Sequence, residues 1–349
     1  MDWHDTAQEH REAFDTYYLW NPIVKRIWLD GPLDDLIAAM AALNDDGTRG
    51  YMDSVYHRNI LEGLRVEPGL RVLNVGCGYG LHELELHRRC PELELVGCDI
   101  SATMLRTARW NRTPAWLAQS AAESLPFADN AFHRVLCREV IEHVIDPAAV
   151  LKELHRVCAP GGVAVVTTPN GSGLVQWAAN LTGWFTNRNV QDEAYRLRDL
   201  RQWISGAGFT IERRVLDGAA YFMLVAWPKW LRWLAPSAAR LARVAERLPI
   251  IRTLICDQVK YVLRKPGQLP ADLGAHPTAR PEPPVETDTD RRLRETVEAA
   301  RMPPPGGATR WVRSLIAAVA VPLAYLALCV VLLPVSLVVL LIDILRGKR

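Results

Sequence analysis

The sequence predicts an α/β domain built on a parallel sheet and followed by a membrane-spanning tail. Three observations lead to this prediction. Over residues 67–217 short apolar runs alternate with helical patterns. One of these runs, at 72–75, enters a glycine-rich turn. Near the C-terminus, a stretch of 29 residues contains no charged side chain. The chain of 349 residues is long enough for one such domain with extensions.

The overall composition excludes several classes of protein. Apolar residues make up 49% and charged residues 23%, as in an ordinary globular protein. The net charge is only +2, so no nucleic-acid partner is expected. The seven cysteines form no C-x-x-C pair, which argues against a structural zinc site and favours a reducing, cytosolic setting. The polar, acidic start MDWHDTAQEH does not have the pattern of a signal peptide.

The expected elements begin with a mainly helical segment at 1–54. A main domain follows at 55–264, interrupted by an insert at 219–254. Residues 265–308 contain nine prolines and are expected to form a flexible linker with one short charged helix at about 290–301. The strands expected in the main domain are 71–75, 93–99, 133–138, 162–167, 210–216 and 258–264.

The tail at 309–349 is predicted to be a transmembrane anchor. Its uncharged stretch, 314–342, exceeds the ~20 residues that cross a bilayer core. A buried core helix is the alternative, but a globular helix of this length should have a polar face. Basic residues flank both ends and leave the orientation open, while Pro322 and Pro334 would also permit a re-entrant hairpin. A single-pass tail anchor would keep the main domain on the cytoplasmic side.

The insert at 219–254 combines tryptophans with basic residues. Trp227, Trp230 and Trp233 recur every three residues, and Lys and Arg stand between them. This mixture is typical of a segment at a bilayer interface, and a core helix beneath a lid is the alternative. We expect the insert to contact lipid.

The glycine-rich turn reads VGCGYG at 75–80. Such a turn suits a nucleotide-like ligand, because the next helix directs its free N–H groups there. The dinucleotide fingerprint G-x-G-x-x-G fails at Leu81, and a phosphate-binding Walker loop fails because no Gly-Lys-Ser/Thr follows. Alternate glycines let the backbone pass close to a flat ligand. A purely structural turn is the alternative.

Asp99 ends the next expected strand, nineteen residues after Gly80. An acid at this place can accept hydrogen bonds from both hydroxyls of a ribose. The alternative is a cap of the following helix, near Ser101.

The chain resembles class I S-adenosyl-L-methionine-dependent methyltransferases over roughly residues 55–217. The resemblance implies a Rossmann-like, seven-stranded mixed sheet whose last strand is antiparallel. It also implies S-adenosyl-L-methionine as the cofactor, lying across the C-terminal edge of the strands. The motifs that carry the resemblance are VLNVGCGYG at 72–80, VGCDIS at 96–101, AAESLPFADNAFHRVLCREVIEHV at 121–144 and LKELHRVCAPGGVAVVTTPN at 151–170.

The resemblance also implies the residues that bind the cofactor. The glycine loop would border its methionine part, Asp99 would bind the ribose, and Ile100 and Met104 would flank the adenine. The full set is Gly76, Cys77, Gly78, Gly80, Asp99, Ile100, Met104, Ala122, Glu123 and Arg138.

Two positions depart from the pattern of such relatives. Many of them have Asp where this chain has Ala121, just before the Ala122-Glu123 pair that would lie beside the adenine edge. Close relatives often have a small or apolar residue where this chain has Arg138, whose backbone would face the methionine part. His82 follows the loop and is interpreted as an isolated core or surface residue.

One cluster could act on the acceptor. On a helix or a helical turn, Glu139, Glu142 and His143 would share a face at i, i+3 and i+4. The three could hold a divalent metal such as Mg²⁺, or Glu142 and His143 could deprotonate a phenol. A solvated or capping pair is the alternative. With Asp146-Pro147 behind it, the string resembles the O-methyltransferases of ubiquinone biosynthesis, which implies a metal that orients a catechol-like acceptor.

We therefore expect a membrane-anchored methyltransferase that acts on a hydrophobic acceptor. A prenylated phenol, a quinol or another lipid hydroxyl is the expected class. Two alternatives stay open: a non-catalytic cofactor-binding scaffold in a membrane-associated complex, and an enzyme on a soluble or protein acceptor whose anchor only sets its location.

Overall fold

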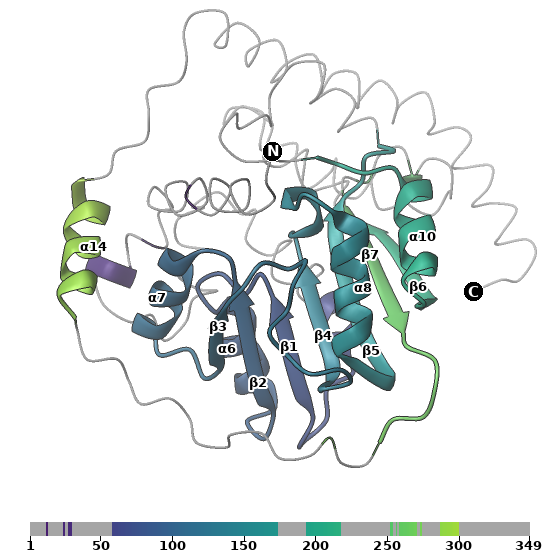
Figure 1. The fold of residues 1–349 in the computed structure, drawn as a ribbon, viewed down its shortest axis with the longest axis horizontal. Coiled ribbons are helices and arrows are strands. Elements are labelled where there is room, and N and C mark those ends of the chain that lie inside the picture. The colour runs from purple at the N-terminus through teal and green to yellow at the C-terminus, as the bar shows by residue number, and fades with distance from the viewer. Residues whose placement is uncertain are drawn as a thin grey trace, which may run out of the picture.

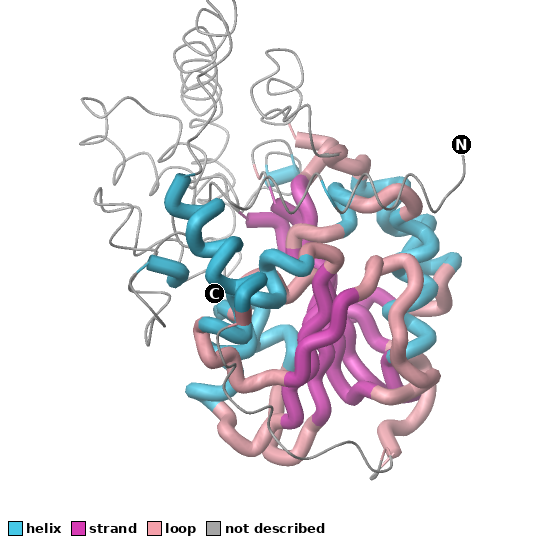
Figure 2. Tube along the Cα trace, turned by 60° about the vertical axis from the view of Figure 1, so that its left-hand side comes forward, coloured by secondary structure: helices cyan, strands magenta, loops and turns pink. Residues whose placement is uncertain are grey.

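The structure is a computed structural model, and it describes residues 12, 24, 27–29, 58–173, 193–217, 252–253, 256, 258–270, 273 and 287–299. Within these residues a seven-stranded sheet forms a central layer with helices on both sides (Figures 1 and 2). The prediction of an α/β fold with a seven-stranded sheet is therefore confirmed.

The strand order is β3-β2-β1-β4-β5-β7-β6. Strands β1 to β5 pair in parallel, whereas β7 is antiparallel to both of its neighbours, so the sheet is mixed as predicted. The strands are β1 (Arg71–Val75), β2 (Glu94–Asp99), β3 (Trp116–Gln119), β4 (Phe132–Arg138), β5 (Cys158–Pro169), β6 (Thr210–Asp217) and β7 (Gln258–Arg264).

Helices bury both faces of the sheet. On one face Leu64 of α5 and Leu86 of α6 pack with Leu136 of β4. On the other face Leu151 of α8 packs with Val135 of β4, as expected for side chains that alternate along a strand. The helices are α5 (Arg58–Leu64), α6 (Leu81–Arg89), α7 (Ala102–Trp110), the 3-10 helix η2 (Ile141–His143), α8 (Pro147–Val157), α10 (Leu197–Gly206) and α14 (Asp288–Ala299).

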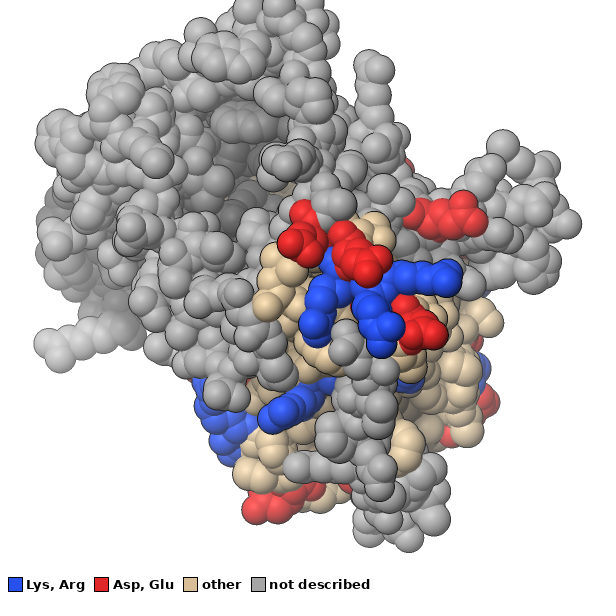
Figure 3. Space-filling model, turned by 90° about the vertical axis from the view of Figure 1, so that its left-hand side faces the viewer, with Lys and Arg blue, Asp and Glu red and all other residues tan. Residues whose placement is uncertain are grey.

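Part of the predicted linker is a packed helix. Helix α14 lies beside α7, where Arg106 Nη1 is 3.1 Å from Asp290 Oδ1. The Arg294 guanidinium lies 5.0 Å from the ring centroid of Trp110, and the Trp28 ring stacks on Trp110 with centroids 5.4 Å apart. Acidic and basic side chains mix on the face of the molecule that carries α14 (Figure 3). This segment of the chain is therefore docked on the main domain.

The membrane-related predictions concern residues that the structure does not describe. The tail at 309–349 lies outside the described residues, as does the insert at 219–254 apart from Arg252 and Thr253. Where the structure does describe the chain, it contains no helix long and apolar enough to span a bilayer. Of the N-terminal segment at 1–54, only residues 12, 24 and 27–29 are described, and these are helical.

Candidate cofactor site

Three parallel strands bring the predicted cofactor residues to one edge of the sheet. Val75 of β1 lies opposite Cys98 of β2 and Cys137 of β4. The next residue of each strand or turn, Gly76, Asp99 and Arg138, therefore lies at the same C-terminal edge. The loop is attached to β2 because the Gly76 and Cys77 N–H groups donate to the Cys98 carbonyl at 2.8 and 3.0 Å.

The three glycines of the loop have different structural roles. All three have left-handed backbones, with φ of 72° at Gly76, 56° at Gly78 and 85° at Gly80. A Cβ at Gly76 would lie 2.2 Å from Val140 Cγ2, and one at Gly80 would lie 2.1 Å from Thr113 Oγ1. A Cβ at Gly78 would meet no atom within 4 Å. Gly76 and Gly80 are thus required by packing, while Gly78 leaves space where a ligand can approach the backbone.

Cys77 is directed into the protein interior. Its side chain is buried, and it approaches Gly97 of β2, where an added Cβ would lie 3.0 Å from Cys77 Sγ. Burial, together with the negative charge of Glu83, raises the pKa of the Cys77 thiol well above its ordinary value of 9.0. A protonated, buried thiol is not a nucleophile, so Cys77 can serve the cofactor only through its backbone.

Asp99 connects the glycine loop to the start of α7. Its Oδ2 accepts the Gly78 N–H at 2.8 Å and its Oδ1 accepts the Ser101 N–H at 2.9 Å. Ser101, not Asp99, caps α7 by accepting the Met104 N–H. Each carboxylate oxygen can accept more than one hydrogen bond, so Asp99 can also bind the hydroxyls of a ribose. Together with the open space at Gly78, this carboxylate fits S-adenosyl-L-methionine.

The two residues predicted to flank the adenine differ in their surroundings. Ile100 is half-buried, and its carbonyl accepts the Gln119 Nε2–H at 3.0 Å. Met104 is fully buried and packs in a cluster with Val24 and Trp28 of the N-terminal segment. Because the Met104 side chain is itself part of this buried cluster, its contact with the adenine stays a prediction.

The loop after β3 is held beside Asp99. The Ser120 N–H donates to the Asp99 carbonyl at 3.0 Å, and Ala122, two residues further along, is buried. Glu123 Oε1 accepts the Ile145 N–H at 3.0 Å. Glu123 therefore joins this loop to the segment that follows η2, and its place beside the adenine stays a prediction.

A buried acid lies below the loop, and sequence analysis did not identify it. Glu83 of α6 is 1% exposed, and its Oε1 accepts the Asn74 Nδ2–H at 2.8 Å. Burial raises the pKa of Glu83 to about 7, although the hydrogen bond from Asn74 opposes this effect. The only signal in the sequence was a polar residue, Asn74, inside an apolar strand.

A second pair was also missed. Arg138 Nη1 lies 3.1 Å from Nε2 of His82, the second residue of α6. From the sequence, His82 was expected to be an isolated residue, and no role was predicted for the Arg138 side chain. The two are 56 positions apart in the sequence, so only the pairing of β1 with β4 brings them together.

The predicted acceptor cluster does not share a helical face. Glu139 has a left-handed backbone, with φ of 51°, and precedes the three-residue helix η2. Glu139 accepts hydrogen bonds from Thr167 Oγ1 at 2.9 Å and Gln258 Nε2 at 3.2 Å. Glu142 is 2% exposed and accepts the Thr168 hydroxyl at 3.0 Å. The i, i+3, i+4 prediction was wrong because the left-handed residue stops the helix from including Glu139.

The predicted metal site is not formed. Glu139, Glu142 and His143 all belong to the described residues, and these contain no group of three His, Cys, Asp or Glu side chains that could hold a metal ion. The two carboxylates instead bind hydroxyl and amide groups of β5 and β7. The arrangement therefore does not fit Mg²⁺ on these three residues.

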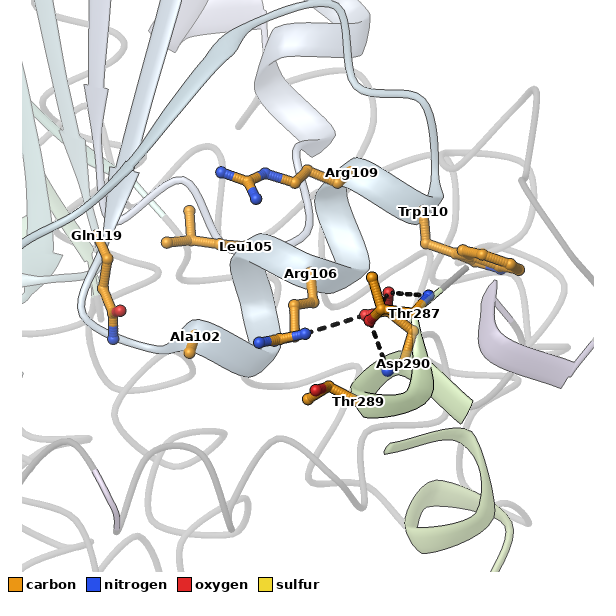
Figure 4. A pocket seen from close by; sticks show the side chains of 9 residues that line it. All are labelled: Ala102, Leu105, Arg106, Arg109, Trp110, Gln119, Thr287, Thr289 and Asp290. Carbon is orange, nitrogen blue, oxygen red and sulfur yellow. Dashed lines mark hydrogen bonds and ion pairs between the residues drawn. The ribbon is translucent and has the colours of Figure 1, made fainter. Parts of the chain in front are cut away.

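A pocket of about 450 Å³ lies away from this edge, between α7 and α14 (Figure 4). Arg106 crosses it to Asp290, and Arg109 points away from this pair (Figure 4). Its lining includes neither the loop glycines nor Asp99. Gln119 links the two regions, because it lines the pocket and donates to the Ile100 carbonyl.

Comparisons with known proteins agree with this geometry. The family model of the methyltransferase domain matches residues 73–166. An uncharacterized methyltransferase of Synechocystis sp. is 32% identical over 189 residues, which cover 52% of this chain and 84% of that protein.

Two other relatives have names that state an activity. The demethylmenaquinone methyltransferase of Beutenbergia cavernae is 32% identical over 136 residues, covering 39% of this chain and 55% of the relative. The ubiquinone biosynthesis O-methyltransferase of Ruegeria pomeroyi is 37% identical over 106 residues, covering 29% of this chain and 42% of the relative. The chain thus spans about half the length of these two relatives.

The glycine loop, the Asp99 carboxylate at the same sheet edge and the match along most of a methyltransferase lead to one assignment. The chain belongs to the class I methyltransferase family and is an S-adenosyl-L-methionine-dependent methyltransferase.

Proposed function

We propose that this methyltransferase is anchored in a membrane and methylates a hydrophobic acceptor there. The observation that carries the proposal is the uncharged stretch at 314–342, which is long enough to cross a bilayer core. The Trp- and Arg-rich insert at 219–254 has the composition of an interfacial segment and supports the same location. In this arrangement the main domain lies on the cytoplasmic side.

The proposed acceptor is a hydroxyl of a prenylated phenol or quinol, or of another lipid. The names of the two relatives refer to demethylmenaquinone and ubiquinone biosynthesis, and these support a quinone-related acceptor. A prenylated acceptor resides in the bilayer, so an anchored enzyme would meet it at high local concentration. This agreement between anchor and acceptor favours a lipid over a soluble molecule.

The residues at the sheet edge would bind the cofactor and orient the acceptor. The glycine loop and Asp99 would hold S-adenosyl-L-methionine, which supplies an electrophilic methyl group on its sulfonium. The protein then contributes mainly position and deprotonation of the acceptor. His143 is half-buried on η2 and is the candidate base. Glu142 is buried, accepts a hydrogen bond from the Thr168 hydroxyl and is a candidate for positioning η2.

The test uses membranes that contain the full chain and methyl-labelled S-adenosyl-L-methionine. We expect label in the lipid extract with the wild type and none with Asp99→Ala. A chain that ends at residue 308 should transfer much less label to lipid while it still binds the cofactor. Label that appears only in soluble or protein fractions would contradict the lipid acceptor, and lipid labelling that is unchanged by the truncation would contradict the role of the anchor.

A further inference from the structure

The side chain of Arg138 lies at the sheet edge where the resemblance to class I methyltransferases would place the methionine part of the cofactor. Leu136, two residues earlier in β4, packs with Leu86 of α6. Because side chains alternate along a strand, Arg138 points to the same face of the sheet as α6. It is half-buried at the C-terminal end of β4, beside the loop that follows β1. The guanidinium is therefore held next to the glycine loop and does not extend into solvent.

One close contact and one charge interaction locate this guanidinium. Nη1 of Arg138 lies 3.1 Å from Nε2 of the buried His82. A guanidinium only donates, so His82 Nε2 accepts and the ring carries its proton on Nδ1. The positive charge of Arg138 also acts on Tyr79 in the glycine loop: burial raises the pKa of this phenol and Arg138 opposes the effect. Arg138 thus borders the loop from one side and α6 from the other.

The neighbouring acid is turned away from Arg138. The left-handed backbone of Glu139 directs its carboxylate to Thr167 and Gln258, on the side of β5 and β7. Arg138 and Glu139 are adjacent in the sequence, yet their side chains bind groups on different elements. These contacts hold the Glu139 carboxylate at β5 and β7, while the Arg138 guanidinium lies beside the glycine loop and α6.

We propose that the Arg138 side chain binds the carboxylate of the methionine part of S-adenosyl-L-methionine, and that His82 positions Arg138 for this contact. The inference rests on the cofactor lying across this sheet edge. The carboxylate is the single anionic group of that ligand, and a planar guanidinium binds a carboxylate through two parallel hydrogen bonds. The five N–H donors of Arg138 allow it to donate to His82 and to the carboxylate together.

The test compares two ligands on the full chain by calorimetric titration. One is S-adenosyl-L-methionine and the other is its decarboxylated form, which lacks only the carboxylate. We expect the wild type to prefer the carboxylated ligand at least tenfold, or about 1.4 kcal/mol. Arg138→Met should reduce this preference to about one, Arg138→Lys should retain part of it, and His82→Asn should weaken it. Both ligands are measured on the same preparation, so a partly misfolded variant leaves the ratio unchanged.

The matched control is Asp99→Ala, which should weaken both ligands by the same factor because both contain the ribose. A preference that survives in Arg138→Met, or a wild type that binds both ligands equally, would overturn the inference and leave the cofactor assignment intact. A folded wild type that binds neither ligand would instead contradict the cofactor assignment itself.

Discussion

At the scale of single residues, the glycine loop separates packing from ligand binding. Gly80 touches Thr113, whereas Gly78 has open space on the side where a Cβ would lie. Both have positive φ, so alanine at either position costs about 1–2 kcal/mol of backbone strain. Only at Gly80 does the added methyl also displace a packed side chain, at a further cost of roughly 1–3 kcal/mol.

This difference gives a paired prediction. Gly78→Ala should weaken S-adenosyl-L-methionine binding at least tenfold and lower the free energy of unfolding by about 1–2 kcal/mol. Gly80→Ala should lower the free energy of unfolding by roughly 2–5 kcal/mol. Calorimetric titration and urea unfolding of both variants measure the two effects. If Gly78→Ala binds the cofactor like the wild type, the space beside Gly78 is not where the ligand lies.

Glu83 makes stability depend on pH. Burial raises its pKa from 4.5 to about 7 in the folded protein. Between these values the folded state holds more protons than the unfolded chain, so this group's contribution to stability falls as the pH rises from 4.5 to 7. The full difference corresponds to roughly 3 kcal/mol.

Glu83→Gln should remove this pH dependence, because an amide oxygen can still accept the Asn74 hydrogen bond and carries no charge. As the pH rises from 5 to 8, the free energy of unfolding of the variant should increase relative to that of the wild type by most of this difference. Urea unfolding across this range measures it. Wild-type and variant stabilities that stay parallel from pH 5 to pH 8 would contradict the account.

At the scale of elements, a capping box closes the N-terminus of α14, and an ion pair joins α14 to α7. Asp290 Oδ2 accepts the Thr287 N–H at 2.9 Å, and the Asp290 N–H donates to Thr287 Oγ1 at 3.2 Å. Its Oδ1 also accepts Arg106 Nη1 at 3.1 Å. Burial raises the pKa of Asp290, but these hydrogen bonds and the charge of Arg106 outweigh it, and the pKa lies below 3.8. The contribution is therefore present above pH 3.8 and is lost as the pH falls through the folded pKa.

Asp290→Ala should loosen the docking of α14 by about 1–2 kcal/mol, because it removes the carboxylate that accepts the Thr287 N–H and that pairs with Arg106. Asp290→Asn retains a capping oxygen and should cost less. Asp288 forms an exposed pair with Arg291, so Asp288→Ala should change docking by no more than about 0.5 kcal/mol. Amide hydrogen exchange of residues 288–299 measures all three. Equal protection in Asp290→Ala and Asp288→Ala would show that the box does not hold the helix.

Sequence patterns predicted the buried strands better than the irregular segments. Strands β1 and β7 have the predicted bounds, because their apolar runs end at clear turn signals. Strand β3 was missed because it has only four residues, none fully buried, and lacks a strong apolar pattern. Strand β5 begins at Cys158, before the predicted start at residue 162, and includes Gly161 and Gly162.

The candidate site was predicted in its main features but not in its contacts. Adjacent parallel strands bring Gly76 and Asp99 together, so position in the sequence was sufficient for them. The Arg138–His82 pair depends on which strands are neighbours in the sheet. The predicted metal-binding triad does not form because Glu139 has a left-handed backbone. The sequence pattern does not show which distant strands pair, or at which residue the backbone becomes left-handed.

At the scale of the whole molecule, the cofactor edge and the proposed anchor belong to different segments of the sequence. The cofactor edge is built by β1, β2 and β4 near the middle of the sheet. Helix α14, which packs against α7, is the last described element before the predicted tail. A membrane anchor would therefore be joined to the domain through a helix that packs on α7.

The measurement that tests the account most directly is calorimetric titration of the full chain with S-adenosyl-L-methionine, beside Asp99→Ala. The control is Asp129→Ala, which removes an exposed acid whose partner is Arg156. We expect the wild type and Asp129→Ala to bind equally, and Asp99→Ala to bind at least tenfold more weakly, which is about 1.4 kcal/mol. Equal binding by Asp99→Ala, or no binding by a folded wild type, would contradict the placement of the cofactor at this edge of the sheet.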